Sequence, residues 1–448
     1  MPSFDRICAA AAAAVILGLV IAFAGDGLFA YFTPDDMMNL YDAWFRPLVE
    51  TDRYLGTLVY RGLFAAFGLN PLPYRAVCFL LLGINLGLLY RFCLRLSNSR
   101  EIAALACLLG AYHAHMADLY YSTGTIYDLL CAAFYLAAFL YATRPSASHS
   151  WKQVGVFLLL YAAALNSKEM AITLPAIVLL YDLLYRRPLS FAREARMLVP
   201  AGLVGAAFLA YKVDGPRKMM ENSAYRPTFT WSAFMDTWRH YTFDLFYGQF
   251  TFTPLRIVLL WLILFGLAAL FRRRVLLFAL LFVFAVMLPV AFIPPRGFFA
   301  IYLVLPGWYL FIAGALVAAR DTIAAPRRSL QVATFAALAL VLVPLHLRQK
   351  PIGNQWVASA HAAVRSVAGH LREVAGPLPR AARVLFVSDP YPKDEWMLTF
   401  IFRLYYRDIE IRVDRSRAMR VPPDAAAQSE YDRLFITDGQ TLTLLPRP

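Results

Sequence analysis

The dominant pattern along the chain is a series of long apolar runs separated by short polar segments. A helix that crosses a bilayer needs about 20 largely apolar residues. Several of the runs are shorter than this or are interrupted by Pro or Gly. About eleven candidates occupy residues 8–30, 74–94, 102–120, 125–142, 154–166, 170–185, 197–213, 255–271, 275–293, 298–319 and 329–347. The pattern predicts an all-α polytopic membrane bundle of about eleven transmembrane helices.

The composition supports the same class. Hydrophobic residues make up 60% of the 448 residues and charged residues only 16%, whereas a soluble domain carries about 25% charged residues. The apolar excess is expected to face lipid. The first run, 8–30, is longer than a signal-peptide core of about 7–15 residues. We therefore expect it to be an uncleaved first span.

The basic residues indicate how the chain is oriented. The net charge is +14, and the Lys and Arg residues gather in short clusters in every second loop. The clusters are Arg91, Arg95 and Arg100; Arg144 and Lys152; Arg186, Arg187, Arg193 and Arg196; Arg272, Arg273 and Arg274; and Arg320, Arg327 and Arg328. This alternation is the positive-inside pattern, and it makes nucleic-acid binding an unfavoured explanation of the charge. We expect a bacterial inner-membrane protein with a cytoplasmic N-terminus and a periplasmic C-terminus.

Two outer loops and a C-terminal tail are long enough to hold structure of their own. The loops are residues 31–73 and 214–254, and the second is rich in Trp, Tyr and Phe. In the tail, helical and strand-like patterns alternate: helices at 356–374 and 396–406, strands at 383–387, 409–413 and 434–436. This order is typical of a small α/β unit. We expect a transmembrane domain at 1–350 and a small extracytoplasmic α/β domain at 351–448.

The first outer loop begins with a pair of carboxylates, Asp35 and Asp36, directly after the first span. One interpretation is a helix start, with Thr33 as N-cap, Pro34 at the first helical position and acids in the first turn. The other is a general base with a partner carboxylate at the membrane boundary, since two acids in such an apolar chain are costly to keep. Both interpretations can hold together.

Two cations lie at the expected outer ends of spans. Lys168 and Glu169 fall between two apolar runs, and Arg296 is the only charged residue in its loop. A guanidinium suits a phosphate bidentately, so Arg296 and Lys168 are candidates for an anionic headgroup. The structural alternatives are a local ion pair or snorkelling side chains for Lys168 and Glu169, and an interfacial anchor for Arg296.

A third group lies near the outer end of the 102–120 run. His113, His115 and Asp118 have residue types that bind metals, but one histidine pair is weak evidence for a metal site, and a hydrogen-bond network is the favoured alternative. Asp128 lies inside an apolar run, which makes it a candidate functional residue by default. We expect no obligatory metal. The five cysteines form no CxxC motif: Cys8, Cys78, Cys93, Cys107 and Cys131.

Together these segments resemble the GT-C superfamily of polytopic glycosyltransferases, and most closely the protein O-mannosyltransferases and their bacterial (family 39-like) relatives. The resemblance covers roughly residues 1–350, and its most specific part is the Ser-Lys-Glu segment. The resemblance rests on Asp35 and Asp36 after the first span and on three further segments. Residues 122–130 are similar to a Ser-Gly-Arg-x-Asp-Leu-Leu stretch of the family, and residues 165–175 to its Ser-Lys-Glu segment. Arg296, before Tyr302 and Pro306, is similar to its Arg-Tyr-x-x-Pro region. In two places the chain departs from the family: Thr125 or Ile126 replaces the family arginine, and Gly-Phe-Phe follows Arg296.

The resemblance implies a GT-C-like fold and an enzyme that moves a sugar from a polyprenyl phosphate to an extracytoplasmic acceptor with inversion. It implies Asp35 or Asp36 as base, and Lys168 and Arg296 as ligands of the donor phosphate. The donor and acceptor pocket would then include Glu169, His115, Asp118, Asp128 and Tyr41. No cofactor is implied beyond the lipid-linked sugar, and the partners are the bilayer, the donor and a protein, lipid or glycan acceptor.

Three other functions compete with this interpretation. A secondary transporter is one, although no internal repeat relates the two halves of the chain, as it does in many transporter folds. A ligase or polymerase of surface polysaccharide is another, and it would need a large Arg-rich outer loop. The third is a non-catalytic envelope assembly protein, in which Asp35 and Asp36 would have no chemical task.

Overall fold

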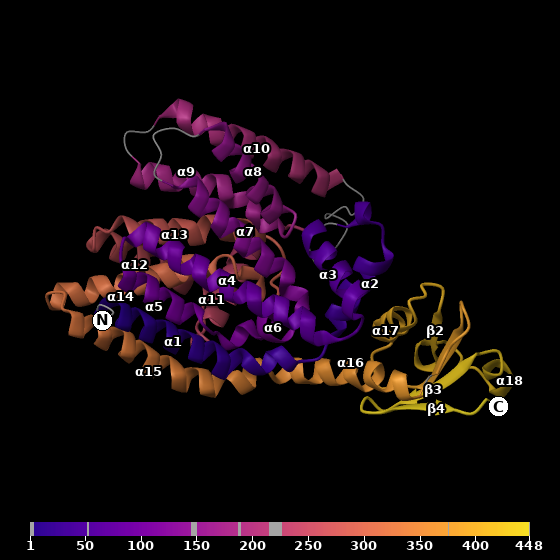
Figure 1. Cartoon of the computed structure of the whole chain (residues 1–448). Helices are drawn as coiled ribbons and strands as arrows, with labels where there is room; N and C mark the ends of the chain where they lie inside the picture. Colours follow the sequence, from indigo (N-terminus) through magenta and orange to yellow (C-terminus); the bar gives the residue numbers. More distant parts are fainter. Residues whose placement is uncertain are drawn as a thin grey trace.

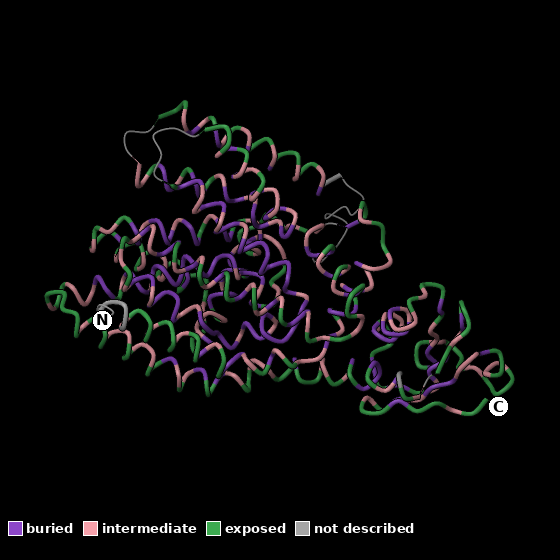
Figure 2. Tube along the Cα trace, viewed as in Figure 1, coloured by how far each residue is buried: buried purple, intermediate pink, exposed green. Residues whose placement is uncertain are grey.

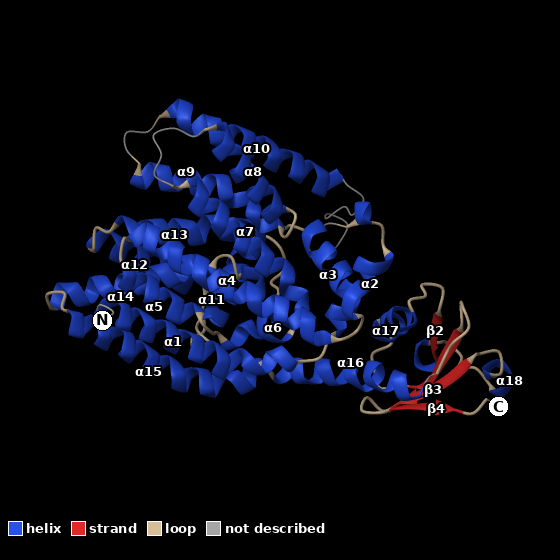
Figure 3. Ribbon diagram, in the orientation of Figure 1, coloured by secondary structure: helices blue, strands red, loops and turns tan. Residues whose placement is uncertain are grey.

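The chain is a helical bundle joined to a small α/β unit (Figure 1). The structure is a computed structural model that describes residues 4–51, 53–144, 150–186, 190–214, 226–374 and 376–447. Arg187, one of the basic residues used above for orientation, lies outside these ranges. Figure 3 shows that the strands gather at one end of the molecule, beyond the end of a long run of helix. That run consists of α15 (Arg328–Gly353) and α16 (Gln355–Val374), so the two parts are joined through helix.

Helices occupy all eleven apolar runs predicted from the sequence. In the described part of the chain, five candidate spans meet the length and hydropathy expected of a membrane helix: Cys8–Phe29 (α1 with η1), Pro71–Ser97 (α4), Thr123–Ala142 (η4 with α7), Phe191–Lys212 (within α10, Phe191–Asp214) and Arg328–Gly353 (α15). A sixth is the pair Arg100–Gly110 (α5) and Ala114–Tyr121 (η3 with α6), which is bent by 63°. The other runs form α8 (Trp151–Leu165), α9 (Leu174–Tyr185), α12 (Pro254–Leu270), α13 (Arg274–Met287) and α14 (Leu305–Ile323). The fold class is confirmed, and the number of spans stays a prediction.

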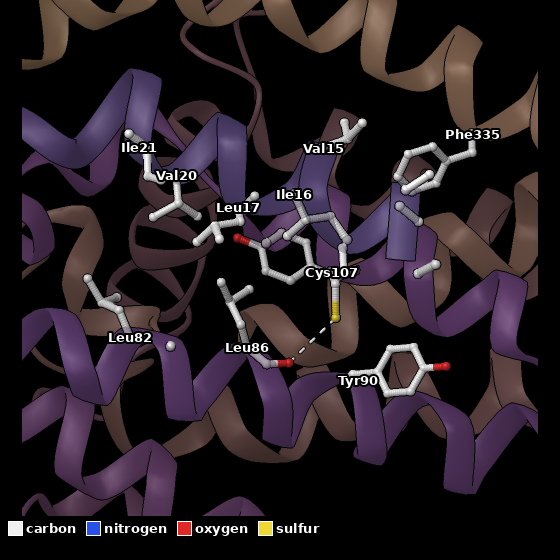
Figure 4. A pocket seen from close by; sticks show the side chains of 18 of the residues that line it. Val15, Ile16, Leu17, Val20, Ile21, Leu82, Leu86, Tyr90, Cys107 and Phe335 are labelled. Atoms are coloured by element: carbon white, nitrogen blue, oxygen red, sulfur yellow. Dashed lines mark hydrogen bonds between the residues drawn. The ribbon is translucent and has the colours of Figure 1, made fainter. Parts of the chain in front are cut away.

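Burial places α7 (Ile126–Ala142) at the centre of the bundle and α1 and α15 at its edge (Figure 2). Most of the α7 span is buried, whereas α1 (Phe4–Ala24) and α15 are largely exposed along apolar faces. Exposed apolar faces of this length are what a bilayer would cover. A groove of about 1530 Å³ lies between α1, α4, α5, α14 and α15, lined mostly by apolar side chains such as those labelled in Figure 4.

The described residues of the two loops that the sequence predicts to be outer loops contain three further helices. The first loop forms α2 (Pro34–Phe45) and α3 (Tyr54–Phe67), which pack against each other, and the second contains α11 (Trp231–Leu245). In α11, Met235, Trp238 and Tyr241 are buried while Trp231 is exposed. One face of this aromatic helix is therefore packed against the bundle.

The α/β unit has a four-stranded sheet in the order β2-β1-β3-β4. Its elements are β1 (Arg383–Ser388), α17 (Met397–Tyr406), β2 (Arg412–Arg415), α18 (Ala425–Gln428), β3 (Arg433–Thr437) and β4 (Leu442–Leu445). β1 is parallel to β2 and β3, and β4 is antiparallel to β3. The predicted helices and first strand are confirmed. The second strand begins three residues later than the expected 409–413, and β4 was not predicted.

The packing of α13 against α14 generates a stability prediction. A Cβ at Gly307 of α14 would lie 2.7 Å from side-chain atoms of Phe282 and Val283 and 3.1 Å from the carbonyl oxygen of Ala279. Gly307→Leu should therefore lower the free energy of unfolding by about 1–3 kcal/mol through overpacking. Gly266→Leu is the matched control, because nothing lies within 4 Å of its Cβ position on α12. Thermal unfolding in detergent measures both, and equal melting temperatures for the two variants would contradict the tight α13–α14 contact.

Candidate functional site

The first turn of α2 holds both carboxylates of the pair. The Thr33 hydroxyl accepts from the Asp36 backbone N–H (3.2 Å), and the Asp36 carboxylate accepts from the Thr33 N–H (2.9 Å). This reciprocal capping box, with Pro34 in the first turn, confirms the helix start predicted from the sequence. Asp36 is completely buried, whereas Asp35 is exposed.

Asp36 connects three distant segments of the chain. One carboxylate oxygen accepts from the Ser122 hydroxyl (2.8 Å) and from the Gly124 N–H (2.7 Å), at the junction between α6 (Ala117–Tyr121) and α7. The other oxygen lies 3.6 Å from the buried guanidinium of Arg75 on α4. A carboxylate offers about four lone-pair sites, and four donors surround this one. Asp36 therefore links the start of α2 to α4 and to the α6–α7 junction.

Arg75 is held by more than Asp36. Its guanidinium donates to the backbone carbonyls of Tyr31 (2.6 Å) and Ala30 (3.3 Å), which lie between the short helix η1 (Gly25–Phe29) and α2. The side chain is only 1% exposed. A buried charge needs this degree of pairing to be tolerated.

Asp35 faces a different environment. Although Asp35 is exposed, the protein around its carboxylate reduces the hydration of this group and raises its pKa above the usual value, and the charge of Asp36 raises the pKa further. Arg296 opposes this shift, and Glu395 of the α/β unit adds to it. The backbone carbonyl of Asp35 accepts a hydrogen bond from the side-chain amide of Asn39 (2.8 Å) within α2. Asp35 is thus a carboxylate open to solvent and under the influence of charges from two other parts of the fold.

The turn that carries Arg296 packs against α6 and α11. A Cβ at Gly297 would lie 3.4 Å from a carboxylate oxygen of Asp118, so these two positions are in contact distance. The backbone of Arg296 is fixed by α11: its N–H donates to the Tyr241 hydroxyl (3.2 Å), and its carbonyl is 2.9 Å from a ring nitrogen of His240. The backbone of Arg296 is therefore held against α11.

Asp118 lies among the acids of the site. Its carboxyl is within electrostatic range of Asp35, Asp36 and Asp128. It thereby connects the acidic pair on α2 with the first turn of α7. These predicted site residues, which are far apart in sequence, are brought to one region of the fold.

Lys168 forms a buried ion pair with Asp128 of α7. The Lys168 ammonium also lies 5.5 Å from the centre of the Phe299 ring. Lys168 directly precedes the short helix η5 (Glu169–Thr173), while Asp128 lies in the first turn of α7. The pairing explains how an acid inside an apolar run is accommodated.

Glu169 points to other partners. Its carboxylate lies 3.1 Å from Arg53, which precedes α3, and 3.2 Å from Lys212 near the end of α10. Burial raises the pKa of Glu169, but Arg53 and Lys212 outweigh it and hold the pKa below the usual range. The local ion-pair interpretation of Lys168 and Glu169 with each other is wrong, because each pairs with a different element.

His115 and His113 belong to a network with α11. A ring nitrogen of His115 lies 3.2 Å from Asp244, whose other oxygen is 3.4 Å from His240. His113 stacks on Tyr247 at 4.1 Å with an 8° angle between the rings. Across the described ranges, no three His, Cys, Asp or Glu side chains are grouped to hold a metal ion. In the structure His115 contacts Asp244 of α11, and His113 contacts Tyr247 just after that helix.

Tyr41 lies apart from the other predicted site residues. Its hydroxyl accepts from the Arg403 guanidinium (2.9 Å), and its ring centre is 4.8 Å from that of Phe400. Both partners are on α17, so Tyr41 joins α2 to the α/β unit. A role in lining the donor or acceptor pocket stays a prediction.

Sequence reasoning missed several charged residues of the site. These are Arg53, Arg75, Lys212, Asp244 and Glu395. Two of them could have been identified from the sequence, because Arg75 begins one apolar run and Lys212 ends another. A charged side chain in such a position costs free energy unless it has a partner. Arg53 and Glu395 lie in polar segments, where a charged residue is not conspicuous, and Asp244 lies in the aromatic loop 214–254.

The two acids of the pair should differ sharply in their effect on stability. Asp36→Ala leaves Arg75 buried without its carboxylate, which should cost about 3–5 kcal/mol. Asp35→Ala removes an exposed acid from a helix start and should cost only about 0.3–1 kcal/mol. Thermal unfolding of the purified variants in detergent measures the difference. Equal loss of stability in both would show that Asp36 does not hold the segments together.

The fold matches solved structures although the sequence is distant. No protein-family model matches the chain, and no curated protein matches it. The crystal structure of ArnT from Cupriavidus metallidurans in the apo state has a TM-score of 0.57 at 13% identity, over 97% of this chain and 94% of that one. The crystal structure of ArnT from Cupriavidus metallidurans bound to undecaprenyl phosphate gives 0.56 at 13% identity, over 96% and 93%. The chain thus has the fold of these structures over nearly its whole length, which confirms the GT-C-like architecture predicted from the sequence.

Proposed function

We propose that this protein is a membrane glycosyltransferase that moves a sugar from a polyprenyl phosphate to an extracytoplasmic acceptor with inversion. The observation that carries the proposal is the acidic pair, in which a buried Asp36 fixes an exposed Asp35 in a site that also contains Arg296. Support comes from the shared fold, since one of the matching ArnT structures is bound to undecaprenyl phosphate.

Asp35 is the better candidate for the base. Asp36 already accepts from Thr33, Ser122 and Gly124 and faces Arg75, so a proton on it would disrupt these contacts. Asp35 is exposed, and its raised pKa makes it a stronger proton acceptor than an ordinary aspartate. The sequence alone did not distinguish the two.

The reaction follows from these roles. The acceptor hydroxyl oxygen, or amine nitrogen, forms a bond to the anomeric carbon while the bond from that carbon to the phosphate oxygen breaks. The acceptor proton moves to Asp35, and the electron pair of the broken bond leaves with the polyprenyl phosphate. Attack from the face opposite the leaving group inverts the anomeric configuration.

The leaving group gains negative charge as its bond breaks, and cations placed in advance stabilise it. Arg296 has the planar donor geometry that suits a phosphate. Lys168 contributes to the same field, since its ammonium has three donors and Asp128 is a single carboxylate partner. We assign the donor phosphate to Arg296 and Lys168.

The remaining predicted residues take supporting roles in this proposal. On the donor side, Asp128 fixes Lys168, Glu169 fixes Arg53 and Lys212, and Asp118 lies within electrostatic range of Asp128. His115 anchors α11 through Asp244. Tyr41 lies on the opposite side, toward the α/β unit. We place the boundary between a catalytic domain, 1–350, and the α/β domain, 351–448, near the end of α15.

Transfer assays test the proposal directly. The full chain in detergent is supplied with radiolabelled polyprenyl-phosphate sugars and an envelope extract. Wild type should transfer label, and Asp35→Asn should reduce turnover by about 10²–10⁴-fold, because positioned base catalysis contributes this much. Asp42→Asn is the matched control, since Asp42 lies on the same helix and pairs with Arg46 (2.8 Å).

Other outcomes separate the alternatives. Equal transfer by wild type and Asp35→Asn would remove this carboxylate from the chemistry. If wild type transferred no label and bound none of the lipid donors, the glycosyltransferase proposal would fail. A flux assay in vesicles would then test the transporter, and an envelope assembly role would predict that Asp35→Asn has no phenotype.

A further inference from the structure

The C-terminal unit contains a buried arginine that organises one loop. Arg415, at the end of β2, is only 5% exposed, and its guanidinium forms a bidentate pair with Asp389 at 2.5 and 3.1 Å. It also donates to the carbonyls of Tyr391 (2.9 Å), Glu395 (2.9 Å) and Lys393 (3.4 Å). All five hydrogen bonds end on the loop 389–396, which connects β1 to α17. This loop is hereafter the β1–α17 loop.

A second anchor fixes the same loop to α16. The Tyr391 hydroxyl lies 3.1 Å from the Ser366 hydroxyl and donates to the carbonyl of Ala363 (3.2 Å). The Tyr391 N–H donates to Asp389 (3.0 Å). The loop is thus held from both sides, which is more than a simple surface connection requires.

The helix that follows the loop is docked on the helix that carries the acidic pair. In Figure 1, α17 lies beside α2. The contacts are Tyr41 with Phe400 and Arg403, and the guanidinium of Arg407, which lies 5.5 Å from the Trp44 ring centre. Because Tyr41 contacts Phe400 and Trp44, further along α2, contacts Arg407, the two helices run in the same direction. The N-terminal end of α17, where the β1–α17 loop ends, therefore lies at the same end as the first turn of α2, which carries Asp35.

We propose that the C-terminal unit contributes the β1–α17 loop to the acceptor side of the site, with Arg415 as the positioning residue that presents Glu395 toward Asp35. The proposal rests on the proposed transferase function. It gives the α/β unit a part in the reaction, because a carboxylate that faces the base changes the pH at which the base is available.

The electrostatic surroundings of Asp35 agree with this geometry. Asp36 acts on it from its own helix, Arg296 from the turn before α14, Asp118 from α6 and Glu395 from the β1–α17 loop. Glu395 and Asp36 raise the pKa of Asp35, and Arg296 lowers it. Loss of the Glu395 charge should therefore lower this pKa and keep the base deprotonated at more acidic pH.

Glu395 also has a structural task, and the test must separate the two. One of its carboxylate oxygens accepts from the Met397 N–H (2.9 Å) at the start of α17. Glu395→Gln keeps a carbonyl oxygen for this bond and removes only the charge. Glu410→Gln is the matched control, since Glu410 is exposed between α17 and β2.

The experiment measures kcat/KM against pH for the full chain. The acidic limb of the kcat/KM–pH profile should shift to lower pH in Glu395→Gln, and it should stay where it is in Glu410→Gln. Arg415→Lys should shift this limb in the same direction, because the variant loses charge-assisted hydrogen bonds to the β1–α17 loop. It should also raise the KM for the acceptor about tenfold, with a smaller change in kcat. The double variant should show no larger shift than Glu395→Gln alone. An unshifted limb in Glu395→Gln would overturn the proposal.

A second measurement does not depend on transfer. Carbodiimide labelling of Asp35, followed by mass spectrometry across pH, reports its protonation directly. The labelling midpoint should fall in Glu395→Gln relative to wild type and Glu410→Gln, and an equal midpoint in all three would reject the proximity of Glu395. If wild type transfers no sugar and binds none of the lipid donors, the proposed function fails while this measurement still decides the geometry. Should Arg415→Lys not fold, Glu395→Gln carries the test alone.

Discussion

The buried carboxylate of Asp36 is the interaction on which the arrangement of the site depends. It joins the start of α2 to the α6–α7 junction through Ser122 and Gly124, and to α4 through Arg75. Successive residues of a helix point about 100° apart. Once Asp36 is fixed inward by four donors, the direction of Asp35 is fixed as well. A pair of adjacent acids thereby divides its tasks: one holds the segments together, and the other is left open to solvent.

The same principle operates at Lys168 and Glu169. These neighbours take opposite directions, Lys168 toward Asp128 on α7 and Glu169 toward Arg53 and Lys212. Each pairing satisfies a charge that would be costly near an apolar bundle. Because the pairs fix their partners in place, the charges of the site are oriented before any substrate enters. In the proposed reaction, electrostatic stabilisation of the leaving phosphate would depend on such advance orientation.

Sequence patterns predicted the parts of this structure that local physics determines. Apolar runs of sufficient length became helices, and Thr33 and Pro34 marked the start of α2, because hydropathy and capping act over a few residues. The pairings within the site could not be predicted in this way, because they join residues far apart in the chain. Arg75 is 39 residues from Asp36, and Ser122 is 86 residues from it. Which of Asp35 and Asp36 is buried depends on those distant partners. In the tail, β2 was misplaced because three of its four residues, Arg412, Asp414 and Arg415, are charged, so that no apolar run marks it. The short strand β4 was not predicted.

The position of the C-terminal unit follows from two attachments at different places. Along α15 and α16, Lys350 pairs with Asp26 at 2.9 Å, and a ring nitrogen of His361 lies 2.7 Å from the Tyr121 carbonyl. Across the other side, α17 contacts α2 through aromatic rings and guanidinium groups. A body held at one point can rotate, whereas contacts at separated points fix its orientation. The β1–α17 loop therefore has a defined place relative to α2, and a side chain on it can act on Asp35 even though about 360 residues separate them in the chain.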